Sequence, residues 1–368
     1  MQKLMFVYGT RPEAIKLAKL IKLTKQNTNF DVVICSTGQQ KDLINNVNSA
    51  LGIYPDIDLN LMRSNEPFEK QHMRYSTALF GVFKQETPNA IVIHGDTATA
   101  LSSANAANEL NIPVFHVEAG LRSGNIASPY PEEYIRTKIA QIATLHFAPT
   151  ESAKQNLIYE KVNGEIYVTG NTEIDALKST LEISIDLNDI YPFLDLQKNI
   201  IFVTVHRTEN RNDKLKNIFN ALIEISKRDD VQIIYSMHPN KIIQKASHML
   251  KKRPNIFIIS PPSPIITHNL LNHAFLIISD SGGLQEDAAY LQKPILVLRN
   301  ETERVELITY NVGILVGSDT ALIVENANKL FNNNSTYEKM CSGHLLYGDG
   351  TASEQILDCI IKYFNTNN

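Results

Sequence analysis

The chain contains no tryptophan and only three cysteines in 368 residues. Cys35, Cys341 and Cys359 lie far apart and form no CxxC pair, which argues against a disulfide framework or a zinc knuckle. No apolar stretch approaches the roughly 18–20 residues of a membrane span. The first apolar run also meets a Gly-Thr-Arg-Pro turn too early for a signal peptide. We therefore expect a cytoplasmic protein with reduced thiols and no membrane partner.

The sequence also lacks a charge excess and the common nucleotide-binding motifs. It has 35 Lys and Arg against 39 Asp and Glu, a net charge of −4, whereas nucleic-acid binders usually carry a basic excess. Neither GxGxxG nor GxxxxGK[ST] occurs, which disfavours nicotinamide and P-loop sites. The sequence has no HxxxH or HxH pattern and no other closely spaced His and Asp ligand signature, which argues against a metal site. We expect no nucleic-acid partner, no cofactor and no metal.

What the sequence does have is a regular alternation of short apolar runs with longer amphipathic segments, which predicts parallel sheets covered by helices. The expected strands are 4–8, 32–35, 90–93, 114–117 and 166–168, then 200–205, 231–236, 256–259, 275–279 and 295–298. Two such series predict an α/β fold with two doubly wound, Rossmann-like domains. Periodicity fades where Asp, Asn and Pro gather in 181–198, so the domains are predicted at 1–180 and 181–351, before a last helix.

Chemistry-bearing residues collect where the predicted strands end, and ligands of open parallel sheets bind beyond those carboxyl ends. The segments are Gly9-Thr10-Arg11-Pro12-Glu13, His94-Gly95-Asp96-Thr97, Glu118-Ala119-Gly120-Leu121-Arg122, His206-Arg207, Met237-His238-Pro239 and Ser279-Asp280-Ser281-Gly282-Gly283. Each alone is compatible with a helix cap or a satisfied turn. Six such segments at the carboxyl ends of the strands of two sheets predict that these segments form the two walls of one cleft.

Two of these segments have the features of anion sites. Pro12 suits the first turn of a helix, whose N-terminus favours an anion, and Arg11 and Lys16 add positive charge nearby. The alternative is that both are exposed on a surface helix. Ser281–Gly283 stand between a strand and a helix, where glycines let backbone amides approach a phosphate closely.

Three further residues extend this second anion site. Glu286 and Asp287 are predicted on the first turn of the helix that follows the glycines, where a carboxylate accepts both hydroxyls of a ribose. A carboxylate there is equally explained by the helix dipole that it offsets. Arg304 offers a third cation for a diphosphate, or is a surface residue.

The candidate acids and bases are Asp96, Glu118 and Glu132. Three carboxylates at one site disfavour full ionisation and raise the pKa of one of them toward neutrality, which suits proton abstraction from carbon. His206, as a cation, would stabilise a departing diphosphate.

The sequence resembles one known family in a set of motifs that share its number, order and spacing. They are Gly9-Thr10-Arg11-Pro12-Glu13-Ala14-Ile15-Lys16, His94-Gly95-Asp96-Thr97, His116-Val117-Glu118-Ala119-Gly120-Leu121-Arg122, Ser128-Pro129-Tyr130-Pro131-Glu132-Glu133, Thr169-Gly170-Asn171-Thr172, His206-Arg207-Thr208-Glu209-Asn210, Asp280-Ser281-Gly282-Gly283-Leu284-Gln285-Glu286, Thr302-Glu303-Arg304 and Tyr347-Gly348-Asp349-Gly350. The family is that of the non-hydrolysing UDP-N-acetylglucosamine 2-epimerases, and the resemblance runs over nearly the whole chain.

The resemblance implies a glycosyltransferase-B-like fold, with a cleft between two Rossmann-like domains and the C-terminal helix, 352–368, packed back on the first. The implied reaction reversibly inverts C2 of UDP-N-acetylglucosamine to give UDP-N-acetylmannosamine. A base takes the C2 proton while UDP leaves C1, and UDP then adds back to a 2-acetamidoglucal. No nicotinamide or metal is needed, and the implied enzyme is a homodimer that supplies precursors of a surface polysaccharide.

The resemblance also assigns roles by position in the motifs. The residues for the UDP phosphates and the leaving charge are Arg11, Lys16, His206, Ser281 and Arg304. Those that handle protons are Asp96, Glu118 and Glu132, without assignment to either face of the sugar. Glu286 and Asp287 align with the acidic pair that includes the ribose ligand.

Four positions depart from the family pattern. Asp287 replaces a second Glu, Ile266–His268 stand where relatives often place Phe against the uracil, and Ile135 replaces the Asn before Arg136. Gln39–Asp42 stand where many relatives read Gln-His-Arg-Glu, a segment that contacts an activating substrate molecule in bacterial enzymes. A modified UDP-HexNAc therefore stays open as the substrate. A UDP-sugar glycosyltransferase of the same architecture is the second alternative, and a non-catalytic UDP-sugar sensor the third.

Overall fold

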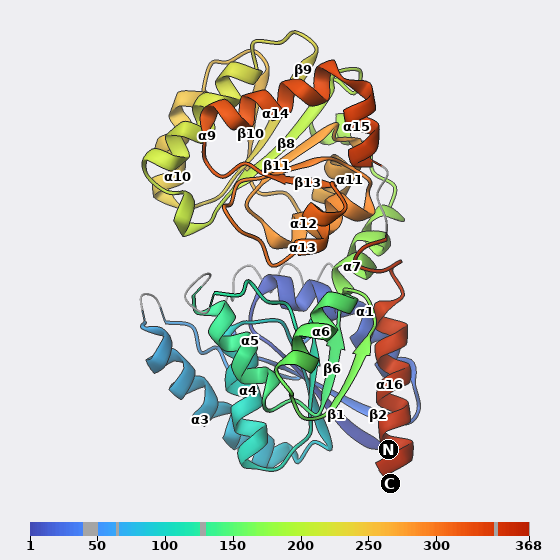
Figure 1. The fold of residues 1–368 in the computed structure, drawn as a ribbon. Coiled ribbons are helices and arrows are strands. Elements are labelled where there is room, and N and C mark those ends of the chain that lie inside the picture. Colours follow the sequence, from blue (N-terminus) through green and yellow to red (C-terminus); the bar gives the residue numbers. More distant parts are fainter. Residues whose placement is uncertain (40–50, 64–65, 126–129, 342–344, 368) are drawn as a thin grey trace. The chain divides into compact units, whose positions relative to one another are not determined.

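The computed structural model describes residues 1–39, 51–63, 66–125, 130–341 and 345–367. The chain forms two compact units, the first of Met1–Ala176 with Gly348–Asn368 and the second of Leu177–Tyr347 (Figure 1). It therefore passes from one unit to the other twice. Among the described residues, no helix combines the length and the apolar character that crossing a membrane requires.

The first unit contains a parallel sheet, seven-stranded in the described part of the chain, with the order β3-β2-β1-β4-β5-β6-β7. Its strands are β1 (Gln2–Tyr8), β2 (Phe30–Ser36), β3 (Ile57–Asp58), β4 (Ala90–His94), β5 (Val114–Val117), β6 (Leu145–Ala148) and β7 (Glu165–Val168). Its helices are α1 (Arg11–Gln26), α3 (Phe68–Glu86), α4 (Ala98–Glu109), α5 (Glu132–Ala140), α6 (Glu151–Tyr159), α7 (Thr172–Leu181), which continues into the second unit, and α16 (Ala352–Asn367).

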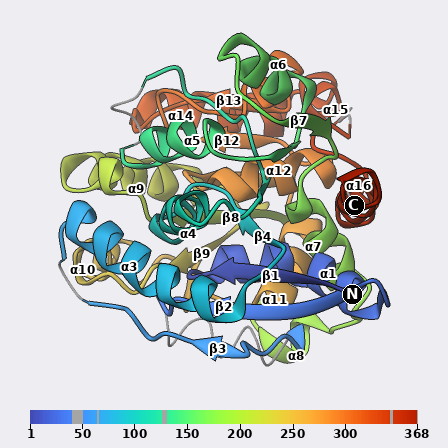
Figure 2. The same cartoon turned by 90° about the horizontal axis from the view of Figure 1, so that it is seen from below.

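Helices cover both faces of this sheet, so its central strands β1, β4, β5 and β6 are buried on both sides. Leu4, Phe6 and Tyr8 of β1 pack in a core with α1 and α16, whereas Met5 and Val7 pack in a core with α3 and α4 (Figure 2). Successive residues of a strand point to opposite faces. Continuous apolar runs, rather than alternating ones, are therefore what such a strand needs.

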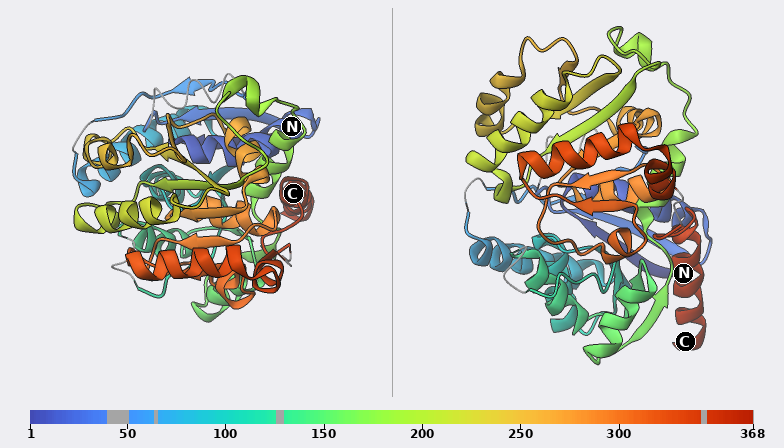
Figure 3. Two further views of the ribbon diagram at one scale, coloured as in Figure 1. Left: turned by 90° about the horizontal axis from the view of Figure 1, so that it is seen from above. Right: turned by 45° about the horizontal axis from the view of Figure 1, so that its top comes forward.

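The second unit repeats this architecture with a parallel sheet, six-stranded in the described residues, of order β10-β9-β8-β11-β12-β13. Its strands are β8 (Asn199–Val205), β9 (Val231–Met237), β10 (Ile256–Ile259), β11 (Leu276–Ser279), β12 (Ile295–Val297) and β13 (Gly313–Leu315). Its helices are α8 (Leu187–Ile190), α9 (Asp213–Ile225), α10 (Lys241–Ser247), α11 (Pro264–His273), α12 (Gly282–Tyr290), α13 (Val305–Thr309), α14 (Thr320–Asn332) and α15 (Asn334–Cys341). Helices α9 and α14 pack side by side and share one core with strands β8, β9, β11 and β12 (Figure 3).

The predicted fold class, a doubly wound α/β fold with two Rossmann-like parts, is confirmed. Three strands, β3, β6 and β13, were missing from the prediction. Two of them, β3 and β13, span only two and three residues, which is too short for periodicity to detect.

The N-terminus of α16 is fastened to the first unit by a buried carboxylate. Asp175 accepts hydrogen bonds from the backbone N–H groups of Ala352 at 3.1 Å and Ser353 at 2.8 Å. Lys19 of α1 donates to the carbonyl of Gly350 at 2.9 Å. Together these contacts dock α16 beside α1.

We expect Asp175→Ala to lower the free energy of unfolding by about 2 kcal/mol or more, because it leaves two buried amides without their acceptor. Urea denaturation measures this. Asp358→Ala, on the exposed face of α16, is the control and should change stability by less than about 0.5 kcal/mol. Equal losses in the two variants would show that Asp175 does not hold the helix.

Candidate active site

The first candidate site lies at a topological switch point of the first sheet. From β1 the chain runs through α1 to β2, whereas β4 lies on the opposite side of β1. The loops after β1 and β4 therefore diverge, which is where ligands bind in open parallel sheets. These loops are Gly9–Thr10 and Gly95–Thr97.

Lys16 of α1 is buried at this switch point, so the alternative of an exposed lysine on a surface helix is wrong. Its ammonium lies 3.0 Å from Glu118 Oε2 and 3.2 Å from Glu173 Oε2. His94, the last residue of β4, lies 3.2 Å from the same Glu118 oxygen. Burial lowers the pKa of His94 to about 4, so the imidazole is neutral near pH 7.

Glu118 has an unusual backbone conformation. It follows β5 directly with φ at +64°, the left-handed region that side chains other than glycine rarely adopt. Such strain persists only where surrounding structure imposes it, and it gathers at functional sites. In this conformation the Glu118 carboxylate contacts Lys16 and His94.

Asp96 is held by a cation that the sequence-based site did not include. The guanidinium of Arg136, on α5, contacts the Asp96 carboxylate and lies 3.1 Å from Glu133. Glu133 in turn accepts from the backbone N–H groups of Ser123 at 3.0 Å and Gly124 at 3.3 Å. Arg136 is 5% exposed, so this pairing is largely shielded from water.

Glu132 begins α5, directly before Glu133, and is partly buried. Arg11 begins α1, and burial lowers the pKa of its guanidinium. Thus Arg11, Lys16, Asp96, Glu118 and Glu132 all lie in the first unit.

Glu13 is a further buried carboxylate, which the sequence analysis placed in a motif without a role. It belongs to a capping box: its side chain accepts from the backbone N–H of the N-cap residue Thr10, whose hydroxyl accepts from the Glu13 N–H. Burial raises the pKa of Glu13 to about 7, although hydrogen bonds from Thr97, Gly9 and Thr10 act in the opposite direction. Glu13, which was not among the predicted acids and bases, is therefore a carboxyl with a pKa near neutrality.

The second candidate site lies at the corresponding switch point of the other sheet, between β8 and β11. Asp280 follows β11 and is fully buried. Its carboxylate accepts from the backbone N–H groups of His206 at 3.1 Å and Arg207 at 3.0 Å, and from Asn210 Nδ2 at 2.9 Å. Burial alone would raise the pKa of Asp280, but these bonds and the His206 ring outweigh it and hold the pKa below its usual value.

His206 is oriented by this carboxylate. Its Nδ1 lies 3.0 Å from Asp280 Oδ1, and its side chain is 38% exposed. Because Nδ1 is engaged, the ring turns Nε2 away from Asp280. The geometry therefore presents one ring nitrogen to a ligand and fixes the other.

Ser281 is the N-cap residue of α12, and Gly282 and Gly283 form its first turn. The Ser281 hydroxyl makes no capping hydrogen bond. An ideal Cβ on Gly282 would lie only 3.0 Å from Nη1 of Arg304, so the absence of a side chain lets this guanidinium lie against the helix terminus.

Arg304 is 4% exposed, so the alternative of a surface arginine is wrong. Its Nε and Nη2 each lie 2.8 Å from Oε1 of Glu286, and its Nη1 contacts Glu303. Glu286 and Asp287 lie in the second turn of α12, because the helix begins at Gly282. The prediction that both carboxylates lie on the first turn of the helix is therefore wrong. The alternative that they offset the helix dipole is wrong too, because the effect of the dipole is confined to the terminal turn.

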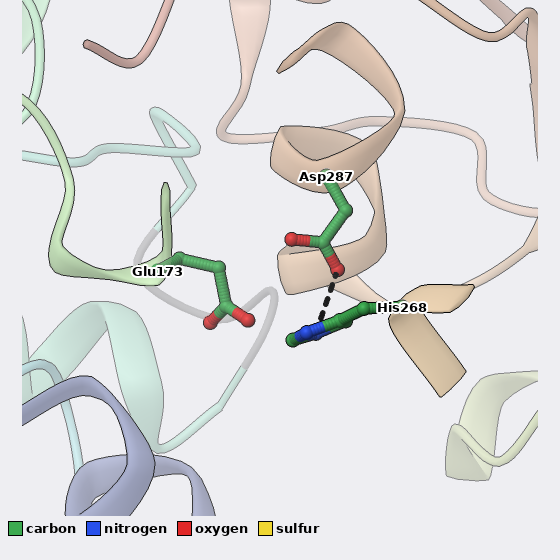
Figure 4. Close-up of side chains that lie close together, drawn as sticks. All are labelled: Glu173, His268 and Asp287. Carbon is green, nitrogen blue, oxygen red and sulfur yellow. Dashed lines mark ion pairs between the residues drawn. The ribbon is translucent and has the colours of Figure 1, made fainter. Parts of the chain in front are cut away.

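His268 lies in the segment where relatives often have Phe. It is buried, its Nε2 lies 3.9 Å from Asp287 Oδ2 (Figure 4), and its Nδ1 pairs with the Thr180 hydroxyl.

Two parts of the predicted motifs, Gln40–Asp42 and Ser128-Pro129, lie outside the described residues.

Comparison with known proteins decides the family. The family model for UDP-N-acetylglucosamine 2-epimerase matches residues 22–361. The UDP-N-acetylglucosamine 2-epimerase of Escherichia coli K12 is 39% identical over 368 residues, which cover 97% of this chain and 98% of that one. The chain belongs to the UDP-N-acetylglucosamine 2-epimerase family.

Solved structures agree with this assignment. The UDP-GlcNAc 2-epimerase of Neisseria meningitidis, bound to UDP-GlcNAc, matches with a TM-score of 0.94 and 36% identity, covering 98% of this chain and all of that one. MurG of Acinetobacter baumannii matches at 13% identity with a TM-score of 0.62, which shows the fold alone. This epimerase-family chain therefore has the predicted glycosyltransferase-B-like fold class.

The raised pKa of Glu13 predicts a dependence of stability on pH. Its native pKa of about 7 exceeds the usual value of 4.5, so its contribution to stability is complete below about pH 4.5 and is lost as pH rises through 7. Relative to Glu13→Gln, which does not titrate, the wild type should lose stability over this range, on the order of 3 kcal/mol at most. Urea denaturation of both proteins from pH 5 to 8 measures the difference, and parallel curves would contradict the raised pKa.

Proposed function

We propose that this chain catalyses the reversible inversion of C2 that interconverts UDP-N-acetylglucosamine and UDP-N-acetylmannosamine. The observation that carries the proposal is the arrangement at the first switch point, where Asp96 pairs with Arg136 and Glu118 with Lys16. Reversible proton transfer at carbon needs carboxylates held at fixed positions, and the family membership supplies the sugar.

The proposed steps are elimination and re-addition. A carboxylate takes the proton from C2 while the C1–O bond breaks, so that the C1–C2 double bond of a 2-acetamidoglucal forms and UDP departs with the electron pair. A second carboxylic acid then delivers a proton to the other face of C2 as UDP adds back to C1. Asp96, Glu118 and Glu132 perform these transfers, and Arg136 and Lys16 stabilise negative charge on Asp96 and Glu118.

We assign UDP binding to the second unit, Leu177–Tyr347. The backbone amides at Ser281–Gly283 point to a phosphate site at the start of α12. Arg304 supports Glu286, the ribose ligand of the proposal, through a forked contact, and His206 faces the leaving diphosphate. The family resemblance assigns Arg11 and Lys16, which belong to the first unit, to the UDP phosphates as well.

A cytoplasmic location, a homodimer and a role in supplying a surface polysaccharide belong to the same proposal and are supported by family resemblance. The modified UDP-HexNAc is the runner-up substrate, because buried His268 occupies the segment where relatives often have Phe. Incubation with UDP-GlcNAc alone separates the candidates. The proposal predicts UDP-ManNAc without an acceptor, whereas conversion of only a modified sugar, or transfer only to an acceptor, would contradict it.

We expect Asp96→Asn, Glu118→Gln and Glu132→Gln each to lower kcat by about 10²–10⁴-fold, the usual contribution of a positioned acid or base. The matched control is Glu86→Gln. Glu86 is also an ion-paired carboxylate of the first unit, 3.4 Å from Lys3, but it lies at the opposite end of the sheet. Near-normal turnover in all three site variants would refute their assignment.

We expect Arg304→Lys to weaken UDP binding about tenfold, or about 1.4 kcal/mol, because an ammonium cannot reproduce the forked contact that orients Glu286. Arg228→Lys is the control: Arg228 makes a forked contact with Asp230 in the same unit, but its side chain is 30% exposed against 5% for that of Arg304. Calorimetry with UDP measures both. Unchanged affinity in Arg304→Lys would remove Arg304 and Glu286 from the UDP site.

A further inference from the structure

Glu13 is buried at the first switch point, and its side chain bridges the two diverging loops. The residue is 2% exposed, so its carboxylate is shielded from a bound sugar. We infer that Glu13 is a positioning residue that sets the spacing between the β1–α1 loop and the β4–α4 loop, and with it the spacing of Arg11 and Asp96. The inference rests on the proposed function, which gives those two residues their roles.

The two carboxylate oxygens of Glu13 serve different loops. Oε2 accepts from the backbone N–H groups of Gly9 at 3.0 Å and Thr10 at 2.7 Å. Oε1 accepts from the hydroxyl of Thr97 at 2.7 Å. Thr97 is itself the N-cap residue of α4 and accepts from the backbone N–H of Ala100 at 3.0 Å. An ordinary capping box stays within one helix, but this one joins the N-termini of two.

The bridge ends next to the functional groups on each side. Arg11 directly follows Thr10, and Asp96 directly precedes Thr97. The loops also approach closely, since an ideal Cβ on Gly9 would lie 2.1 Å from the Thr99 hydroxyl of α4. A displacement of about 1 Å between reacting groups costs on the order of 10²-fold in rate, so this spacing is worth fixing.

Capping alone does not explain a carboxylate here. Helices α1 and α6 are both capped by a threonine hydroxyl, but α6 has Ala153, whose N–H donates to Thr150 at 3.1 Å, where α1 has Glu13. A buried carboxyl is more costly, as the raised pKa of Glu13 shows. The hydrogen bond from Thr97 to the second oxygen of Glu13 is a contact that capping of α1 does not need.

The test compares Glu13→Ala, Thr97→Val, the double variant and Glu13→Gln. Glu13→Ala and Thr97→Val each remove the bridge, so each should lower kcat by about 10²-fold, with a smaller change in KM. The double variant should be no slower than the slower single variant, because both substitutions break one bridge. Glu13→Gln should keep at least a third of kcat, since its amide oxygen accepts from the Gly9 and Thr10 amides while its NH₂ donates to Thr97.

Thr150→Val is the matched control, because it removes the same hydroxyl from an N-cap of the same unit, at a different strand end. It should leave kcat within about threefold of the wild type, since α6 is outside the proposed bridge. Additive losses in the double variant, a Glu13→Gln as slow as Glu13→Ala, or a slow Thr150→Val would overturn the inference in favour of a merely structural role.

A second readout does not depend on activity. Glu13 and Thr97 are 84 residues apart in sequence, so Thr97→Val should accelerate amide hydrogen exchange in the peptide that contains Gly9 and Thr10 only if the bridge exists. Thr150→Val should not. A wild type that fails to invert C2 would refute the proposed function, whereas unchanged exchange at Gly9 and Thr10 in Thr97→Val would refute the bridge itself.

Discussion

A buried carboxylate ties together the two diverging loops at the switch point of each sheet, and the candidate sites depend on these ties. Glu13 joins the loops after β1 and β4, and Asp280 joins those after β8 and β11. A doubly wound sheet leaves its loops apart at the point where ligands bind. Each carboxylate satisfies backbone amides there and holds the neighbouring Arg11, Asp96 or His206 in place.

The two carboxylates differ in pKa for a physical reason. Burial raises the pKa of Glu13 to about 7, because its accepted hydrogen bonds only partly offset desolvation. Asp280 is also buried, but the His206 ring, Asn210 and backbone amides lower its pKa below the usual value. Asp280 is thus a fixed negative charge beside the His206 ring, whereas Glu13 is an acceptor whose neutral form is also accessible near pH 7.

Sequence reasoning found the fold class and the strand ends, because apolar runs and Gly-rich turns are local signals. It did not find the partners, since Arg136 with Asp96 and Arg304 with Glu286 are brought together only by tertiary packing. The start of α12 was placed two residues late, because Gly282 and Gly283 are poor helix formers whose place beside Arg304 only the structure reveals. The site roles themselves stay predictions until variants are measured.

Proton NMR of UDP-GlcNAc with this protein in D₂O tests the central claim most directly. If C2 is inverted by elimination and re-addition, its C–H bond breaks in every productive cycle, and solvent supplies the returning hydrogen. The product UDP-ManNAc should then carry deuterium at C2, and recovered UDP-GlcNAc should acquire it with time. Inverted product that retains full protium at C2 would contradict the account.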